Sequence, residues 1–369
     1  MLVTLTTLMS NVAIITVIPH LKDYFNNENI ELLSRLMITL PSLSIALLAP
    51  FLGHLIYKIG KKRTSIISLI IFSISGTAGL YLNTIESLLL SRAILGVSIA
   101  ALMIVATSLV GDYFSGTQRD KYMGIQGAFT SVGGIIFVVG GGFLSDIDWR
   151  LAFSIYGIGI ILLPFVIKFL IEIKHEEEKT TQEQELNSNL FYIYFLAFLV
   201  MVAFYILPTQ VPFLMINHFG ASGALTGTII SIAFVFHAIG AMSFAKLKGK
   251  FPFSIIYIMG MLIIAFGFIL IGLVQNVYLF FITAPIMGFG GGILMTNVTA
   301  WMLSRAHQKR RVKSSGYLTS SLFMGQFFSP LLTMPIVSIF GVQDFFIVMG
   351  IMMIFLIFIV IFILRKRLR

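Results

Sequence analysis

The chain has 369 residues, of which 58% are hydrophobic and only 11% are charged. A soluble domain carries about 25% charged residues, and a soluble core of this size could not bury so much apolar surface. The composition therefore excludes an ordinary soluble protein and predicts that lipid surrounds most of the chain. The net charge of +10 comes from short basic clusters between apolar runs. That pattern is typical of loop charges on a membrane protein rather than of a nucleic-acid-binding surface.

Apolar runs long enough to cross a bilayer recur along the whole chain. A helical span needs ~20 mostly apolar residues, and a barrel strand needs only about half as many. Twelve such runs are present, at residues 2–21, 34–57, 64–82, 86–110, 122–144, 150–173, 190–217, 223–245, 253–274, 277–304, 315–338 and 343–364. We expect the first run to be a retained span, since no basic segment precedes it and no small-residue cleavage site follows it. The predicted fold class is an all-α integral membrane protein with twelve transmembrane helices.

Lysine and arginine positions predict the orientation of these spans. Only Lys22, Arg35 and Arg150 fall on one side, and only Arg92 falls deep in a span. The other lysines and arginines follow the alternate loops and the C-terminal end, which is the bias of cytoplasmic segments. We therefore expect a multi-pass protein of the plasma (inner) membrane with both termini in the cytoplasm.

The spans divide into two similar sets of six. An acid-rich polar segment at residues 174–189 separates the sets and is typical of a solvated linker. The stretch SRAILGVSIAA, at residues 91–101, aligns with TAPIMGFGGGI 192 residues later, and the same offset places Gly124 on Gly316. Parallel six-helix repeats are typical of transporters that hold a substrate between their halves near the bilayer midplane. The expected domains are two six-helix bundles and a linker, at residues 1–173, 190–369 and 174–189.

The sequence lacks the motifs of several other functional classes. It contains no cysteine, which excludes disulfides, thiolate metal sites and cysteine nucleophiles. It also contains no phosphate loop, no HExxH pair, no GxSxG and no TVGYG filter. We therefore expect neither an enzyme nor a requirement for a cofactor or metal.

A basic motif, GHLIYKIGKKR, follows the second predicted span and places four cations within six residues. Its glycines allow the helix end to approach a neighbour closely, and its cations can bond the terminal carbonyls of nearby helices. Lys58 and Arg63 are also explained by membrane topology alone. The residues that we expect to form a conformational switch are Gly53, Tyr57, Lys58, Gly60, Lys62 and Arg63.

This motif and the twelve spans resemble the major facilitator superfamily over essentially the whole chain, most closely its drug:proton antiporter and efflux branches. In that family an acid stands at the position of Tyr57 and helps to latch the cytoplasmic side in the outward-facing state. Tyrosine titrates near 10, so Tyr57 cannot carry that charge at neutral pH. Asp112, at the end of the fourth predicted span, is the candidate substitute.

The fourth span carries the second resemblance, SRAILG, with Arg92 and Gly96. Related families have an arginine and a glycine at this spacing, facing the cavity. An arginine inside a span costs ~3 kcal/mol or more, so Arg92 should face either a substrate or structural partners such as carbonyl groups. Both roles remain open on sequence alone. No acid lies deep in any span, so a substrate role for Arg92 would favour an anionic or zwitterionic compound.

The fifth span, GGIIFVVGGGFL, matches the antiporter pattern in its glycines. Phe137 and Val138 replace the glycine and proline of that pattern, which weakens the specific resemblance to antiporters. The glycines for which we expect close helix packing are Gly96, Gly133, Gly141 and Gly142.

None of the fifteen acids falls at the centre of a span. Some antiporter relatives carry an acid on the middle turn of the first span, where this chain has Ser10 and Asn11. His237 and Glu86 are therefore the proton-coupling candidates, although His237 could instead be a hydrogen-bonded core residue. The candidates for substrate binding are Arg92, Asn11, Gln126, Tyr205, Gln210, Asn297, Trp301 and Gln326.

The resemblance implies a secondary active transporter that exports a small organic compound by alternating access. A metabolite importer or facilitator of the same fold is the alternative, and a non-transporting receptor or channel is a remote one. The expected partners are a small-molecule substrate and the lipid bilayer, without nucleic acid. We favour a monomer.

Overall fold

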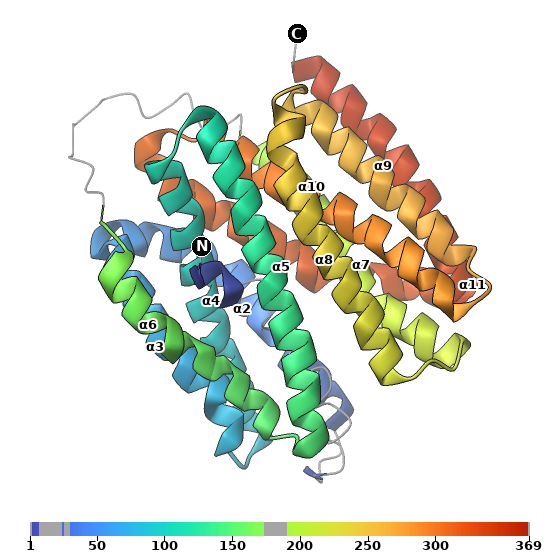
Figure 1. Cartoon of the computed structure of the whole chain (residues 1–369), viewed down its shortest axis with the longest axis horizontal. Coiled ribbons are helices and arrows are strands. Elements are labelled where there is room, and N and C mark those ends of the chain that lie inside the picture. The colour runs from blue at the N-terminus through green and yellow to red at the C-terminus, as the bar shows by residue number, and fades with distance from the viewer. Residues whose placement is uncertain (1, 7–23, 26–29, 173–189, 368–369) are drawn as a thin grey trace. The chain divides into compact units, whose positions relative to one another are not determined.

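The computed structural model describes residues 2–6, 24–25, 30–172 and 190–367 (Figure 1). This part of the chain is helical and contains no strand. Ten of its segments are long and apolar enough to cross a membrane. The predicted all-α membrane class is therefore confirmed. Most of the first expected span lies outside the described residues.

The secondary-structure elements follow one another along the chain. In order they are η1 (Leu2–Thr6), α2 (Ile30–Ile59), α3 (Lys61–Gly76), η3 (Thr77–Leu80), α4 (Ile85–Tyr113), α5 (Gly116–Ile147), η4 (Leu151–Gly157), α6 (Ile158–Phe169), α7 (Phe191–Phe213), η5 (Leu214–His218), α8 (Gly223–Lys248), α9 (Phe253–Gly272), η6 (Val277–Leu279), α10 (Phe280–Arg305), η7 (Gln308–Arg310) and α11 (Arg311–Arg367). The last two expected spans both lie in α11, which is interrupted at Gly341, where φ is 79°.

Local sequence determines where several helices begin. Thr84 and Ser222 precede α4 and α8, and their side-chain oxygens accept the backbone N–H groups of Ser87 and Leu225. Such caps satisfy N–H groups that have no partner inside the helix. Gly60 separates α2 from α3 with φ at 94°, a conformation that glycine adopts far more readily than other residues.

The chain forms two compact units, each built from segments that are distant in sequence. Unit 1 comprises Met1–Ser115, Val132–Phe195 and Met302–Met324, and unit 2 comprises Gly116–Ser131, Leu196–Trp301 and Gly325–Arg369. The boundaries pass through α5, α7, α10 and α11, so each of these helices contributes to both units.

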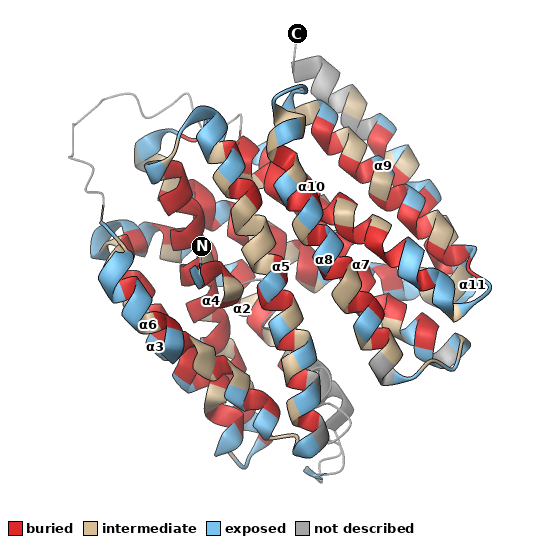
Figure 2. Cartoon of the chain, viewed as in Figure 1, coloured by how far each residue is buried: buried red, intermediate tan, exposed pale blue. Residues whose placement is uncertain are grey.

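Helix α4 is the core of unit 1, where it packs against α2 and α3. Buried residues run along most of its length (Figure 2). A Cβ atom at Gly96 of α4 would lie 2.5 Å from the carbonyl oxygen of Pro41 in α2. The glycine therefore allows the two backbones to touch, as small residues do at helix interfaces in membranes.

Unit 2 uses the same kind of packing between α8 and α10. A Cβ atom at Gly288 would lie 2.0 Å from the carbonyl oxygen of Ala233, and one at Gly292 would lie 2.0 Å from that of His237. The glycine-rich start of α10 therefore lies directly against the backbone of α8.

One pair of contacts recurs in both units. A Cβ atom at Gly316 of α11 would lie 2.6 Å from the carbonyl oxygen of Ala49 in α2, within unit 1. A Cβ atom at Gly124 of α5 would lie 2.5 Å from the carbonyl oxygen of Ala241 in α8, within unit 2. Both residues of the second contact are related to those of the first by the offset of 192. Equivalent residues of the sequence repeat thus pack α11 on α2 and α5 on α8.

Candidate functional site

A cluster of buried charges in unit 1 surrounds Asp112 at the end of α4. The Asp112 side chain is fully buried and accepts a short hydrogen bond from the ammonium group of Lys61. The Nη1 atom of Arg311 lies 3.9 Å from the other carboxylate oxygen. These interactions join the start of α3, the end of α4 and the start of α11. Buried charges are costly to separate from their partners, so the cluster stabilises this arrangement of the three helices.

Glu172, which follows α6, is the fourth charged residue of this cluster. Its two carboxylate oxygens accept the backbone N–H groups of Lys61 at 2.7 Å and Lys62 at 2.6 Å. These N–H groups open α3, where the helix dipole favours a negative charge. We call Lys61, Asp112, Glu172 and Arg311 the charged cluster.

The start of α11 is fastened to both α4 and α2. Arg311 donates a short hydrogen bond to the carbonyl oxygen of Gly111, and Ser320 donates one to that of Ala46 in α2. A Cβ atom at Gly53 of α2 would lie 3.0 Å from the carbonyl oxygen of Val312. Gly53 thus has the close-packing position that the motif predicts.

The other residues of the predicted switch motif lie on the surface of the unit. Tyr57 is 45% exposed, and Lys58 and Arg63 are also exposed. Lys62 is half-buried and contributes its backbone N–H to the Glu172 contact. The acids near this turn are therefore Asp112 and Glu172, supplied by other helices.

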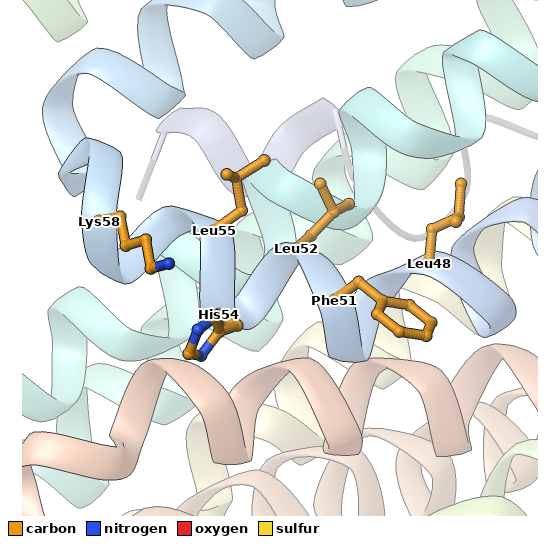
Figure 3. A pocket seen from close by; sticks show the side chains of 6 residues that line it. All are labelled: Leu48, Phe51, Leu52, His54, Leu55 and Lys58. Carbon is orange, nitrogen blue, oxygen red and sulfur yellow. The ribbon is translucent and has the colours of Figure 1, made fainter.

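An apolar groove of about 350 Å³ runs along α2 and ends at Lys58. The side chains that line it all come from α2 (Figure 3), and they are Leu48, Phe51, Leu52, His54, Leu55 and Lys58. A groove formed by one face of one apolar span is what a helix surface presents to lipid. It differs from the concave sites, with polar groups converging from several elements, that bind small molecules.

Arg92 is fully buried in unit 1 between α4, the end of α3 and η4. Its Nη2 atom donates to the carbonyl oxygens of Ser75 at 2.9 Å and Gly76 at 2.8 Å. Its guanidinium carbon lies 5.0 Å from the ring centre of Phe153 and 5.1 Å from that of Tyr156. Carbonyl oxygens and aromatic faces both stabilise a buried cation. Of the two roles that the sequence leaves open, these contacts support the structural one.

Two glycines make room for the rings that enclose Arg92. A Cβ atom at Gly76 would lie 2.3 Å from the Cβ atom of Tyr156, and one at Gly79 would lie 2.2 Å from the Phe153 ring. The end of α3 and the following η3 therefore cannot carry larger residues at these two positions without displacing the aromatic side chains.

In unit 2, three of the predicted substrate-binding residues lie on the facing helices α7 and α11. Gln210 of α7 donates to the hydroxyl of Thr333 of α11 at 3.3 Å, and Tyr205 neighbours Gln326. Gln326 is 1% exposed, and apart from its interaction with Tyr205 its amide has no hydrogen-bond partner among the described residues. An unsatisfied buried amide costs about 1–3 kcal/mol, which a polar ligand could recover. We call Tyr205, Gln210, Gln326 and Thr333 the polar seam.

His237 of α8 lies in the same unit with Ser131 of α5. The Nδ1 atom of His237 is 2.6 Å from the Ser131 oxygen, which lies 3.0 Å from the carbonyl oxygen of Gly127. The Ser131 hydroxyl has one proton, so the direction of the His237 hydrogen bond depends on the ring tautomer, and Nε2 has no partner among the described residues. The ring packs 5.0 Å from that of Phe204, and the side chain is 3% exposed.

Two further predicted substrate-binding residues contact the start of α9. Asn297 donates to the carbonyl oxygen of Phe253 at 3.1 Å, and Trp301 stacks on the Phe253 ring at 5.7 Å. Gln126 is half-buried on α5 in unit 2, and Glu86 is exposed in the first turn of α4. Asn11 lies outside the described residues.

The expected packing glycines of the fifth span all lie in α5. A Cβ atom at Gly133 would lie 2.0 Å from the carbonyl oxygen of Leu5 in η1. Gly141 is buried, whereas the burial of Gly142 is outside what the structure describes.

The predicted site residues do not include Lys61, Glu172, Arg311, Ser131 or Thr333. Glu172 and Lys61 are 111 residues apart, and Ser131 and His237 are 106 residues apart. The sequence gives only weak signals for two of them. Glu172 is an acid at the end of one predicted span, and Arg311 is a cation just before another.

A family profile described as "Major Facilitator Superfamily" matches residues 1–192 and again residues 193–369. The chain belongs to the major facilitator superfamily. It is therefore a member of a family of multi-pass membrane transporters, in agreement with the resemblance seen in the switch motif.

Two bacterial members of the superfamily are similar in sequence. Multidrug resistance protein 2 of Bacillus subtilis (strain 168) is 30% identical over 224 residues, which cover 57% of this chain and 56% of the relative. Quinolone resistance protein NorA of Staphylococcus aureus is 31% identical over 146 residues, which cover 40% of this chain and 37% of the relative. The matched part thus spans about half or less of each curated relative.

Two solved superfamily structures share the fold along nearly the whole chain. The human organic anion transporter MFSD10 (TETRAN) superposes with a TM-score of 0.80 at 15% identity, covering 97% of this chain and 98% of that one. The transporter FucP in the outward conformation superposes with a TM-score of 0.73 at 14% identity, covering 98% of this chain and 96% of that one.

Proposed function

We propose that this chain is a secondary active transporter that exports a small organic compound by alternating access. Residues 1–173 and 190–369 would rock against each other, with both termini in the cytoplasm beneath the plasma (inner) membrane. The resistance proteins among its relatives support export.

The charged cluster is the observation that carries this proposal. Asp112 holds Lys61 from the first half of the sequence and Arg311 from the second half. If α11 moves away from α2 and α4, the buried carboxylate of Asp112 loses Arg311, which is one of its two cations. A cluster with one closed and one broken arrangement is a suitable two-state element for a protein that alternates between two conformations.

The polar seam is our candidate for substrate contact. Gln326 brings an amide with unused hydrogen-bonding capacity, and Gln210 and Tyr205 lie on the facing helix. The Nη2 atom of Arg92 bonds to two carbonyl oxygens and two aromatic rings enclose its guanidinium group, so we place the substrate on the seam instead. We retain an anionic or zwitterionic cargo as part of the proposal, and the compound class in the name of the staphylococcal relative, the quinolones, supplies the test compound.

Counterflow in proteoliposomes tests this function. Vesicles preloaded with an unlabelled quinolone should transiently accumulate the labelled compound above its equilibrium level, because a carrier exchanges one molecule for another. Gln326→Ala should lower the initial rate about tenfold if the amide makes one or two hydrogen bonds to the cargo. Simple equilibration without overshoot would contradict a carrier, and a flat trace would contradict this cargo.

His237 is our candidate for proton coupling. Histidine is the side chain whose ordinary titration falls between pH 5 and 8, and His237 lies inside α8 in contact with Ser131 of α5. We expect His237→Gln to abolish the pH dependence of transport while substrate binding persists. Transport rates across that pH range, together with binding measured by thermal shift, check this. An unchanged pH profile would show that His237 is not the coupling residue. Either Glu86 would then have this role, or transport would not be coupled to protons.

A further inference from the structure

We propose that Glu172 is a positioning residue of the conformational switch: by capping α3, its carboxylate holds Lys61 in place against Asp112. This inference rests on the proposed function, because it assigns Glu172 to the switch that alternating access requires.

The cap is a two-point contact. Each carboxylate oxygen of Glu172 accepts a different backbone N–H, that of Lys61 at 2.7 Å and that of Lys62 at 2.6 Å. Hydrogen bonds to an ionised acceptor are stronger than neutral ones, and the start of a helix favours a negative charge. The backbone of the first residues of α3 is therefore fixed by a side chain from beyond the end of α6.

Gly60 makes this contact possible. Its φ of 94° turns the chain between α2 and α3, and a Cβ atom there would lie 3.3 Å from the nearer Glu172 oxygen. Lys61 directly follows Gly60 in the chain. The turn at Gly60 and the cap by Glu172 therefore determine the position of the Lys61 backbone, from which its side chain extends to Asp112.

A second bond holds the segment after α6 in this position. The hydroxyl of Tyr113, next to Asp112 in sequence, donates a short hydrogen bond to the carbonyl oxygen of Ile171. The segment is thus tied to the end of α4 through Ile171 and to the start of α3 through Glu172. It therefore joins the two helices whose side chains form the Lys61–Asp112 pair.

Glu172 also explains how the motif operates without an acid at position 57. Tyr57 is 45% exposed, whereas the Glu172 carboxylate binds the backbone of the turn that the motif builds. The negative charge at this turn is supplied by the segment that follows α6 rather than by α2.

The test uses the absence of cysteine from the chain. In Ser320→Cys, the introduced thiol replaces a hydroxyl that bonds to the carbonyl oxygen of Ala46 in α2, so it reports whether α11 leaves α2. In purified protein reconstituted in nanodiscs, Glu172→Gln should raise the rate of maleimide labelling at this position about fivefold. Glu172→Asp, which keeps the charge, should recover most of the slow labelling.

Three comparisons make the result specific. Asp344→Asn removes an exposed acid from another part of α11 and should leave the rate unchanged. Asp112→Asn should raise the rate by itself, and adding Glu172→Gln should raise it no further, because both act through Lys61. Ser98→Cys, at a buried position of α4, should stay unlabelled in the Glu172→Gln background.

The outcomes separate this inference from the proposed function. A normal rate in Glu172→Gln beside a raised rate in Asp112→Asn would overturn the positioning role. So would additive effects of the two changes, or labelling of Ser98→Cys, which would indicate general unfolding. A normal rate in Asp112→Asn would instead contradict the switch itself.

Discussion

Replacing Asp112 with asparagine should destabilise the protein by about 3–5 kcal/mol and abolish most transport. The substitution leaves the Lys61 ammonium buried without its carboxylate and removes the counter-charge of Arg311. Removing one partner of a buried ion pair costs this much because the remaining charge loses both its water and its partner. Thermal unfolding in detergent and counterflow in proteoliposomes measure the two effects.

A second substitution separates charge pairing from general damage. Lys61→Met removes the orphaned cation, so the double variant Lys61→Met/Asp112→Asn should be more stable than Asp112→Asn alone. Asp344→Asn, an exposed acid in α11, is the matched control and should change neither measurement. Equal melting temperatures for the Asp112→Asn variant and the unmodified protein would show that the cluster does not stabilise the fold.

Arg92→Ala should cause a comparable loss of stability through a different mechanism. It removes two hydrogen bonds to the carbonyls of Ser75 and Gly76 and empties the space between the rings of Phe153 and Tyr156. We expect a loss of about 3 kcal/mol or more, from lost bonds and an unfilled cavity. Melting temperature and the yield of folded protein are the measurements.

Arg92→Lys distinguishes this structural role from an electrostatic role toward substrate. Lysine keeps the charge but lacks the planar group that lies between two aromatic faces, so it should remain clearly less stable than arginine. Transport per folded molecule should then change much less than stability in both variants. If folded Arg92→Ala loses quinolone transport but still exports a cationic dye at the normal rate, Arg92 acts on the anionic cargo instead.

The switch motif shows how far the sequence could predict the site. Its pattern predicts that the turn after the second span brings glycines and cations against other helices, and the structure places Gly53 against α11 and Lys61 against Asp112. It draws equal attention to Tyr57 and Lys58, which are exposed. It gives no sign of Glu172, because helical periodicity does not report which distant side chain reaches a helix start.

The polar residues of the spans show the same division. Sequence alone identifies Tyr205, Gln210 and Gln326 as unusual in an apolar setting, and the structure brings them together between α7 and α11. Asn297 is also a polar residue in an apolar span, yet it bonds to the start of α9. A polar residue in a span requires a partner, but its rotation about the helix axis decides which one it meets.

The sequence by itself determined that this protein is helical, lies in a membrane and consists of two related sets of spans. Those properties depend on the transfer of each ~20-residue segment into lipid and on the charges of the adjoining loops, which are local quantities. Only the tertiary structure decided that Asp112 pairs with Lys61 and Arg311 and that Glu172 caps α3. These contacts join residues that lie between 51 positions (Lys61 and Asp112) and 199 positions (Asp112 and Arg311) apart in the sequence. They depend on how helices approach and rotate against one another, which glycine packing controls and hydropathy does not record.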